Sequence, residues 1–374
     1  MPRVYHSRGS VGPRVRRDRP GSDSEGVRLK SQDILRWLPY AVMAVVAVVD
    51  VLAGPRLGFL PLLTLGPTFA SVSGTVGRTA MAGGIALAIC VPLASYNNLL
   101  GRPQNYLTIA TIGAVTGASM LAGRLRIRRE HELANVRRVA EAAQRVLLRP
   151  VPRRAGDLRI ALSYTSAAAE SQIGGDLYEV VTTPTGVRLL IGDVQGKGLE
   201  AVETAAWALG AFREAAYEEE ELTRLCERLE TSLARHLGGE QFVTALLAEV
   251  HDDEITLLAC GHPPPIVLKH DGRVFSALPP EEAPPLGLGP LGAPRPKPYS
   301  VPFEEGDQIL LYTDGVIEAR DGKGRFYPLE ERVGVLAQDD PQDALDGLRD
   351  DLLRHVGGPI LDDAAMLLVL RHRD

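Results

Sequence analysis

A long apolar region near the N-terminus limits what this chain can fold into more than any other feature. Between Trp37 and Gly123 the only charged residues are Asp50, Arg56, Arg78 and Arg102. They separate four apolar segments, at about 37–53, 58–77, 79–97 and 105–123. Each approaches the ~20 residues that a helix needs to cross a bilayer with its backbone polar groups satisfied. We therefore predict four transmembrane helices within residues 33–123; the alternative is a buried helical hairpin domain of a soluble protein.

Positively charged residues flank the apolar region on both sides. Residues 1–32 are rich in Arg, Gly, Ser and Pro, so we interpret them as a disordered basic tail. The sequence RLRIRRE, residues 124–130, follows the last apolar segment. An even number of spans places both stretches on one side, which the positive-inside rule makes the cytoplasm. We predict a multi-pass protein of the cell membrane with a cytoplasmic C-terminal domain, and interpret Asp50 as an interfacial residue at the outer end of the first span.

Residues 124–150 are expected to form a charged helical linker. A short heptad seam is formed by Leu133, Val136, Ala140, Ala143 and Leu147, which follow one another in alternating steps of three and four. Such a seam can pair two chains into a homodimer beneath the membrane. It can equally well lie on the C-terminal domain of its own chain. The sequence leaves both interpretations open.

Beyond Pro150 and Pro152 the pattern becomes mostly that of β-strands. Apolar runs typical of strands lie at 158–163, 177–182, 187–192, 242–250, 254–260, 265–269, 308–313 and 365–371. Helical patterns lie at about 199–217, 221–237, 329–337 and 341–355. Strands outnumber helices and short turns join several of them, which predicts a largely antiparallel α+β domain at 151–374. The Pro-rich stretch 271–305 is expected to be a surface loop.

Composition and short motifs argue against several classes of function. The net charge of −6 does not favour nucleic-acid binding. The three cysteines, Cys90, Cys226 and Cys260, have neither zinc-ligand spacing nor a disulfide pattern. The GKG at 196–198 lacks the spacing of a Walker-type nucleotide loop.

Four acidic motifs of the C-terminal domain share one pattern, in which an aspartate lies at the end of an apolar strand, usually beside glycine. They are SQIGGDLYEV with Asp176, IGDVQGKG with Asp193, ILLYTDGVIEAR with Asp314, and LDDAAMLLVLR with Asp362 and Asp363. Each aspartate alone is better explained by a turn or a strand cap, but together, in this order, they favour a metal site. Gathered at one edge of a sheet sandwich, their charges would repel one another by several kcal/mol unless cations compensate them. Oxygen ligands favour Mg²⁺ or Mn²⁺ over zinc, and two ions about 4 Å apart can activate a water and bind phosphate oxygens.

His262, in CGHPPPIVL at 260–268, also needs an interpretation. It is either a proton donor or orienting residue near the acidic motifs, or a structural residue in a turn that the three following prolines make rigid. We favour the structural role.

The ordered set GGDLY, GDVQGKG, CGHPPP, YTDG and DDAAMLLVLR is similar to the PPM-type (protein phosphatase 2C-like) metal-dependent Ser/Thr phosphatases. It most resembles their bacterial SpoIIE-like branch, which acts on sigma-factor regulators, and the likeness covers roughly 155–372. The resemblance implies an antiparallel β-sandwich flanked by helices, with a centre of two Mn²⁺ or Mg²⁺ ions at one edge. It also implies that water activated by these metals attacks a phosphoserine or phosphothreonine.

The resemblance assigns roles to individual residues. Asp176 and Asp193 match the first two metal-ligand motifs and would be the catalytic residues, with Asp193 bridging both ions. The backbone carbonyl of Val194 would be a further ligand. Asp314 and Asp362 match the later ligands, with Asp363 in support. Three departures from the family pattern are Glu179 where Asp is usual, Cys260 where Ala is usual, and Ala365 where Thr is frequent. The phosphate-binding Arg of the eukaryotic enzymes is also missing, which leaves open how phosphate is oriented.

These observations predict a membrane-anchored protein-serine/threonine phosphatase for signal transduction. By family analogy its substrate is a phosphorylated anti-sigma-factor antagonist. The main alternative is a catalytically silent signalling scaffold with a phosphatase-like domain, against which the four intact motifs argue. A small-molecule transporter ranks last, because polar residues are scarce in the apolar segments.

Overall fold

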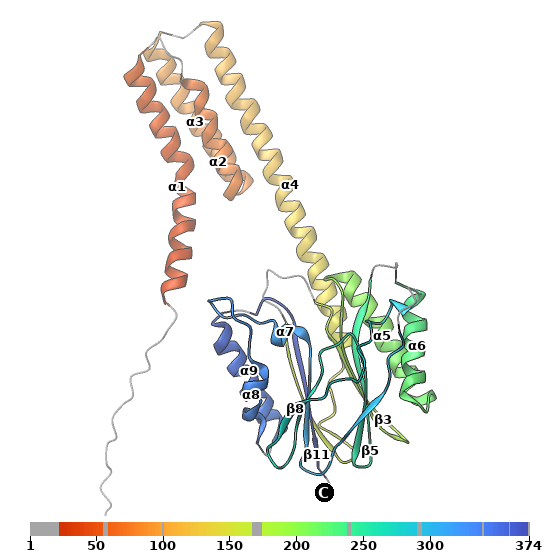
Figure 1. Cartoon of the computed structure of the whole chain (residues 1–374). Coiled ribbons are helices and arrows are strands. Elements are labelled where there is room, and N and C mark those ends of the chain that lie inside the picture. Colours follow the sequence, from red (N-terminus) through yellow and green to blue (C-terminus); the bar gives the residue numbers. More distant parts are fainter. Residues whose placement is uncertain are drawn as a thin grey trace, which may run out of the picture. The chain divides into compact units, whose positions relative to one another are not determined.

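The computed structural model describes residues 22–54, 59–98, 101–166, 174–237, 241–289, 294–338, 340–358 and 360–372. The chain divides into two compact units, Met1–Glu132 and Leu133–Asp374 (Figure 1). The N-terminal unit is helical and the C-terminal unit is built mainly from strands. The division therefore follows the change from apolar helical to β-type patterning in the sequence.

The N-terminal unit consists of apolar helices. They are α1 (Ser22–Ala53), η1 (Leu60–Thr64), α2 (Leu65–Ser73), α3 (Val76–Tyr96) and the first part of α4 (Pro103–Leu147). Their shared core contains Met43, Leu63 and Ile112. Gly66 packs closely on Met43, and a Cβ at that position would lie 2.4 Å from the methionine sulfur, so the side chain of Met43 would have to move.

Within the described residues, three helices of this unit are long and apolar enough to cross a membrane, where the sequence predicts four. They are Arg36–Ala53, Val76–Tyr96 and Pro103–Leu147. The second predicted segment instead forms the shorter helix Leu60–Val72. Pro61 lies in the first turn of η1, where proline is favoured, and Gly74 is the residue at which α2 ends, so the helical part is shorter than the apolar segment.

Two details bear on the sequence-based interpretation. Residues 1–21 of the predicted tail, 1–32, lie outside the described residues. Residues 22–32 belong to α1. Asp50 is fully buried among the helices, and its position at the membrane interface stays a prediction. Asn97 Nδ2 donates to its carboxylate at 2.8 Å, and the backbone N–H of Phe59 donates at 3.2 Å. These two donors offset part of the cost of burying the carboxylate.

The predicted linker is the C-terminal part of α4, which runs without a break from the last apolar segment to Leu147. Ala140 is buried against Val202, and Ala143 and Leu147 pack beside them. Val136 is exposed. The end of the predicted seam thus packs on the C-terminal unit of its own chain, whereas a homodimer through its upper part stays a prediction.

The C-terminal unit contains two antiparallel sheets (Figure 1). The strand order of the first is β1 (Arg154–Ala155), β2 (Leu158–Thr165), β11 (Ala364–Arg371), β10 (Gln308–Tyr312), β7 (Ile266–Leu268) and β8 (Val274–Ser276). That of the second is β3 (Leu177–Thr183), β4 (Gly186–Val194), β5 (Val243–His251), β6 (Glu254–Cys260) and β9 (Tyr299–Pro302). Apolar side chains of both sheets, among them Leu189, Leu246 and Leu367, form one core. The unit is therefore a β-sandwich.

Helices cover the outer face of each sheet. Helices α5 (Leu199–Glu218) and α6 (Leu222–Ala234) contact β3, β4 and β5. On the other sheet, α9 (Pro341–Val356) contacts β2 and β11, beside α8 (Leu329–Arg332) and η3 (Val333–Leu336). Phe212 and Leu348 are fully buried in these two outer cores. Central strands such as β11 are buried on both faces, which explains their continuous apolar sequences.

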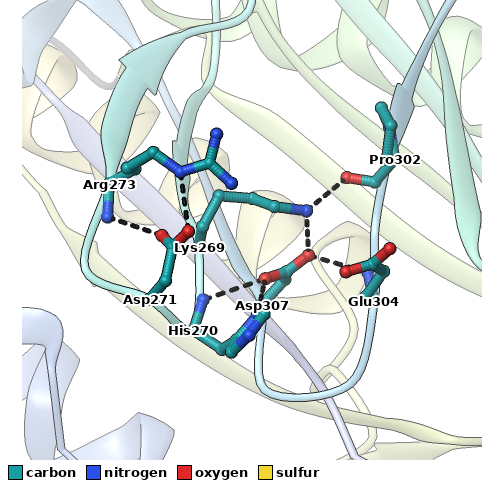
Figure 2. A network of polar contacts seen from close by, with 7 residues as sticks. All are labelled: Lys269, His270, Asp271, Arg273, Pro302, Glu304 and Asp307. Atoms are coloured by element: carbon teal, nitrogen blue, oxygen red, sulfur yellow. Dashed lines mark hydrogen bonds and ion pairs between the residues drawn. The ribbon is translucent and has the colours of Figure 1, made fainter.

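The predicted surface loop at 271–305 is partly wrong, because it contains β8 and β9. Both are short, lie at sheet edges and carry exposed residues, so they lack an apolar run. Figure 2 shows a network of polar contacts around Asp307 that joins the segments next to β8 and β9. The buried carboxylate of Asp307 accepts hydrogen bonds from Lys269 and from the backbone N–H groups of His270 (2.9 Å) and Glu304 (2.7 Å). Burial alone would raise the pKa of Asp307, but these hydrogen bonds lower it below its usual value.

Candidate metal centre

Three glycines bring the acidic motifs into contact at one end of the sandwich. A Cβ at Gly174 would lie 2.4 Å from Oδ2 of Asp363, and one at Gly175 would lie 2.4 Å from the carbonyl oxygen of Val194. A Cβ at Gly315 would lie 1.8 Å from the carbonyl oxygen of Asp363. Only glycine allows such close approach. The glycines beside the aspartates therefore let motifs that are far apart in sequence pack against one another.

Asp176 lies immediately before β3 and is buried. Its Oδ2 accepts a hydrogen bond of 2.9 Å from the hydroxyl of Thr313. That hydroxyl oxygen in turn accepts a 3.0 Å hydrogen bond from the backbone N–H of Ala365. One threonine thus joins the first, third and fourth acidic motifs. The carboxylate of Asp193, near the end of β4, lies close enough to that of Asp176 for their charges to interact.

The carboxylates lie close enough to change one another's ionisation. Burial, followed by the charge of Asp193, raises the pKa of Asp176 well above its usual value. Burial and then the charges of Asp314, Asp362 and Asp363 raise the pKa of Asp193 to about 7. Burial and neighbouring carboxylates also raise the pKa of Asp314. All five predicted carboxylates therefore belong to one electrostatically coupled cluster, with a surplus of negative charge.

Hydrogen-bond donors from other elements hold the fourth motif. Lys197 Nζ donates to Asp362 Oδ1 at 2.8 Å. The hydroxyl of Tyr164 donates to Asp363, and Gln144 Nε2 on α4 donates to the Tyr164 oxygen at 2.9 Å. The sequence reasoning missed these residues. The GKG motif contains Lys197 and could have indicated it, but no motif contains Tyr164 or Gln144.

The cluster fits hard divalent cations by its chemistry, since its side-chain ligands are all carboxylate oxygens with unfavourable mutual charge. Among the described residues, however, no three His, Cys, Asp or Glu side chains are already arranged to hold a metal ion. The carbonyl oxygen of Val194 faces Gly175. The individual ligand assignments therefore stay predictions: Asp176, Asp193, Val194, Asp314, Asp362 and Asp363.

His262 is buried behind the cluster and supports it indirectly. Its Nε2 lies 3.1 Å from the carbonyl oxygen of Tyr312, which can only accept, so Nε2 carries the proton. Its Nδ1 then accepts from the hydroxyl of Thr244 at 3.1 Å. The oxygen of that hydroxyl accepts from the backbone N–H of Asp193 at 3.3 Å. Burial lowers the pKa of His262 to about 4, so it is neutral, and whether its role is structural or orienting stays a prediction.

Glu179, the departure from the family pattern in the first motif, does not join the cluster. It is buried, and Nε of Arg213 donates to its carboxylate at 2.6 Å. Arg213 also donates to the carbonyl oxygen of Leu147, the last residue of α4, at 2.8 Å. Glu179 therefore helps to fix the end of the linker helix on α5.

A cleft of about 530 Å³ opens beside the cluster. Asp314 forms one wall, and Pro263, Pro264 and Pro279 form rigid apolar walls. Glu282 adds a carboxylate. A cleft of this size can take a few residues of an extended peptide.

The packing of Gly315 gives a prediction about stability. We expect Gly315→Ala to lower the free energy of unfolding by about 3 kcal/mol, because the new methyl group would collide with a backbone carbonyl that cannot rotate away. Urea unfolding of the two proteins measures this difference. Gly322→Ala is the matched control, since a Cβ there meets nothing within 4 Å, and it should change stability by less than about 0.5 kcal/mol. Equal stability of Gly315→Ala and the parent would contradict the close packing.

Comparison with protein families identifies the C-terminal half of the chain. The model of the stage II sporulation protein E (SpoIIE) family matches residues 183–372. The phosphoserine phosphatase RsbU of Bacillus subtilis (strain 168) is 24% identical over 207 residues, which cover 54% of this chain and 60% of RsbU. The match thus spans less than two thirds of that relative.

Comparison with solved structures bears on the fold. The SiaA-PP2C domain of Pseudomonas aeruginosa superposes with a TM-score of 0.54 at 16% identity, over 66% of this chain and 99% of that domain. The RsbU and RsbW domains of a Mycobacterium tuberculosis protein give a TM-score of 0.49 at 27% identity, over 58% of this chain and 61% of that one. The first likeness identifies the architecture as PP2C-like, and at this identity it identifies the fold alone.

Proposed function

This chain belongs to the SpoIIE family, and we propose on that basis that it is a metal-dependent protein serine/threonine phosphatase anchored in the cell membrane. The observation that carries the proposal is the coupled cluster of Asp176, Asp193 and Asp314 beside an open cleft. RsbU, a phosphoserine phosphatase, supports the same reaction for the aligned part of the chain. The substrate that fits is a phosphoserine or phosphothreonine protein, and by analogy with the family an anti-sigma-factor antagonist.

The residues of the cluster divide the work as follows. Asp176, Asp193, Asp314 and Asp362 would hold two Mn²⁺ or Mg²⁺ ions, with Asp363 and the Val194 carbonyl in support. When bound, the ions supply a water nucleophile at neutral pH and Lewis-acid stabilisation of phosphate oxygens. Thr313 orients Asp176 through its hydroxyl, and Thr244, held by His262, orients the backbone at Asp193. The cleft walls position the peptide and exclude bulk water.

Our proposed arrangement places the apolar helices in the membrane and the phosphatase domain, 151–374, in the cytoplasm. Three helices long and apolar enough to span support membrane attachment. The basic residues at 124–130, in α4, support a cytoplasmic position for the part of the chain that follows. Lys and Arg within about 15–20 residues of a span end favour the cytoplasmic side.

Activity and orientation can be tested in one experiment. Inverted and right-side-out membrane vesicles containing the full chain are incubated with a phosphoserine peptide and Mn²⁺, and released phosphate is measured. We expect turnover in inverted vesicles, suppression by EDTA, and turnover in right-side-out vesicles only after detergent is added. Turnover that EDTA does not reduce would contradict metal dependence. Equal turnover in intact inverted and right-side-out vesicles would contradict the proposed topology.

One observation favours a second candidate, the catalytically silent scaffold. Within the described part of the chain no three side chains are already arranged around a metal ion. Titration calorimetry with Mn²⁺ separates the two functions. Binding that is lost in Asp193→Asn supports the phosphatase, whereas no binding to the parent protein supports the scaffold.

A further inference from the structure

Two cysteines that are 34 residues apart in sequence meet inside the C-terminal unit. Cys226 lies on α6 and Cys260 is the last residue of β6. Their sulfur atoms are 3.6 Å apart, and both side chains are buried. A covalent disulfide has an S–S bond of about 2.05 Å, so closing the gap requires a movement of only about 1.5 Å. The sequence alone showed no disulfide pattern, because the pair exists only after α6 packs on the sheet.

A cavity gives small molecules access to this thiol pair. It has a volume of about 330 Å³, and both cysteines line it. Glu227, Glu230 and Arg295 also line it, so part of its wall is polar. A water molecule occupies about 30 Å³ in the liquid. A molecule the size of hydrogen peroxide can therefore reach the sulfur atoms without unfolding of the domain.

The thiol pair lies beside the polypeptide that supports the metal centre. Cys260 pairs with Ala245 of β5, next to Thr244. Gly261 follows with φ +63°, and a Cβ there would lie 2.6 Å from Pro285. His262 comes next and holds Thr244, whose hydroxyl contacts Asp193. A bond at Cys260 would thus tie α6 to the strand end from which His262 reaches the cluster.

We propose that Cys226 and Cys260 are an oxidant-sensitive pair that forms a reversible disulfide when hydrogen peroxide enters the cavity. The sulfur of Cys226 attacks one peroxide oxygen, the O–O bond breaks, and one water leaves, which gives a sulfenic acid on Cys226. The sulfur of Cys260 then attacks the Cys226 sulfur, and the hydroxyl leaves as a second water with the Cys260 proton. Two thiols lose two electrons and two protons, and one peroxide becomes two waters.

The hydrogen bond with Cys226, and then burial, raise the pKa of the Cys260 thiol well above its usual value. Since the thiolate is the reactive form, Cys260 reacts slowly with peroxide. Either order of the two steps gives the same disulfide. In a reducing compartment, such as the cytoplasm proposed above, the bond would be transient and thiol reductants would reverse it.

The experiment is peptide mapping of the full chain in detergent. The protein is treated with hydrogen peroxide, its remaining thiols are alkylated under denaturing conditions, and the unreduced digest is analysed by mass spectrometry. We expect a linked peptide pair containing Cys226 and Cys260, two hydrogens lighter than the sum of its parts, that disappears with dithiothreitol. Cys90→Ser should keep the link, since Cys90 lies in the N-terminal unit. Cys226→Ser and Cys260→Ala should each lose it.

The outcome in the parent protein decides the proposal even if a cysteine variant fails to fold. Full alkylation of both thiols after peroxide treatment would overturn it. So would oxidation of Cys226 to sulfinic acid without a link, or a link that involves Cys90. None of these readouts depends on phosphatase activity, so they test the thiol pair separately from the proposed function.

Discussion

Replacing Asp193 by asparagine should reduce Mn²⁺-dependent hydrolysis of a phosphoserine peptide roughly a thousand-fold, because a metal centre contributes several kcal/mol to transition-state stabilisation. Asp193 is the second-last residue of β4, and the charges of Asp314, Asp362 and Asp363 all act on its carboxylate. Asparagine keeps the shape but removes the charge and one ligand oxygen. Initial rates of phosphate release at saturating Mn²⁺ measure the effect.

A loss of activity is informative only if the variant is folded. Asp252→Asn is the matched control, because Asp252 lies in the β5–β6 turn with an 85% exposed side chain and φ +46°, which asparagine tolerates. It should keep full activity. Asp193→Asn should be at least as stable as the parent protein without metal at neutral pH, since it removes a repelling charge. Parent-like turnover in Asp193→Asn would contradict the assignment of this residue and the proposed metal centre.

The fold could be predicted wherever burial determines the sequence. The central strands β4, β5, β10 and β11 are buried on both faces, so their apolar runs appear directly in the sequence. The edge strands β8 and β9 are short and half-exposed, and nothing in 271–305 marks them. The second apolar segment was predicted to span the membrane from its composition, but its helix is shorter. Pro61 and Gly74, which mark the ends of that helix, do not change the apolar composition on which the prediction was based.

From the sequence, only those site residues could be predicted that belong to the glycine–aspartate motifs. Strand ends that meet at one edge were expected to bring Asp176, Asp193 and Asp314 together. In the structure these carboxylates are close enough for their charges to interact. The partners that hold the cluster come from elsewhere: Tyr164 from β2 and Gln144 from α4. Such contacts depend on the tertiary packing of elements that carry no motif. The same holds for Cys226 and Cys260.

The second large effect is on the free energy of unfolding. We expect Asp193→Asn to be more stable than the parent protein without metal and less stable with it. The pKa of Asp193 is about 7 in the folded protein, above the 3.8 of an unperturbed aspartate. A group whose folded pKa is raised contributes stability that is fully present below pH 3.8 and is lost as the pH rises to about 7. Without metal, ionised Asp193 should therefore cost up to about 4 kcal/mol at neutral pH, a cost that Asp193→Asn avoids. We expect the variant to become more stable than the parent protein as the pH rises from 4 to 7.

The difference between the two proteins is the quantity to measure, because other groups titrate in the same range. His262 acts in the opposite sense. Its folded pKa of about 4 lies below the usual 6.5, so its contribution is present above pH 6.5 and is lost as the pH falls. Since His262 is present in both proteins, its effect cancels in the difference. Urea unfolding of the full chain in detergent and EDTA, followed by Trp207 fluorescence in a Trp37→Phe background, reports on the C-terminal unit alone.

Saturating Mn²⁺ should invert the order of stability. Cations compensate the clustered carboxylates, and each of the two ions adds about 2.7 kcal/mol when it binds the folded state alone at a hundred times its Kd, so both together exceed the cost of about 4 kcal/mol. The parent protein should gain this stability, whereas Asp193→Asn, with weakened binding, should gain little. A stability difference that does not change between pH 4 and 7 in EDTA would show that Asp193 does not carry the charge of a coupled cluster. An equal Mn²⁺ response in both proteins would show that the cations bind elsewhere, because a site that includes Asp193 cannot bind them equally well after its charge is removed.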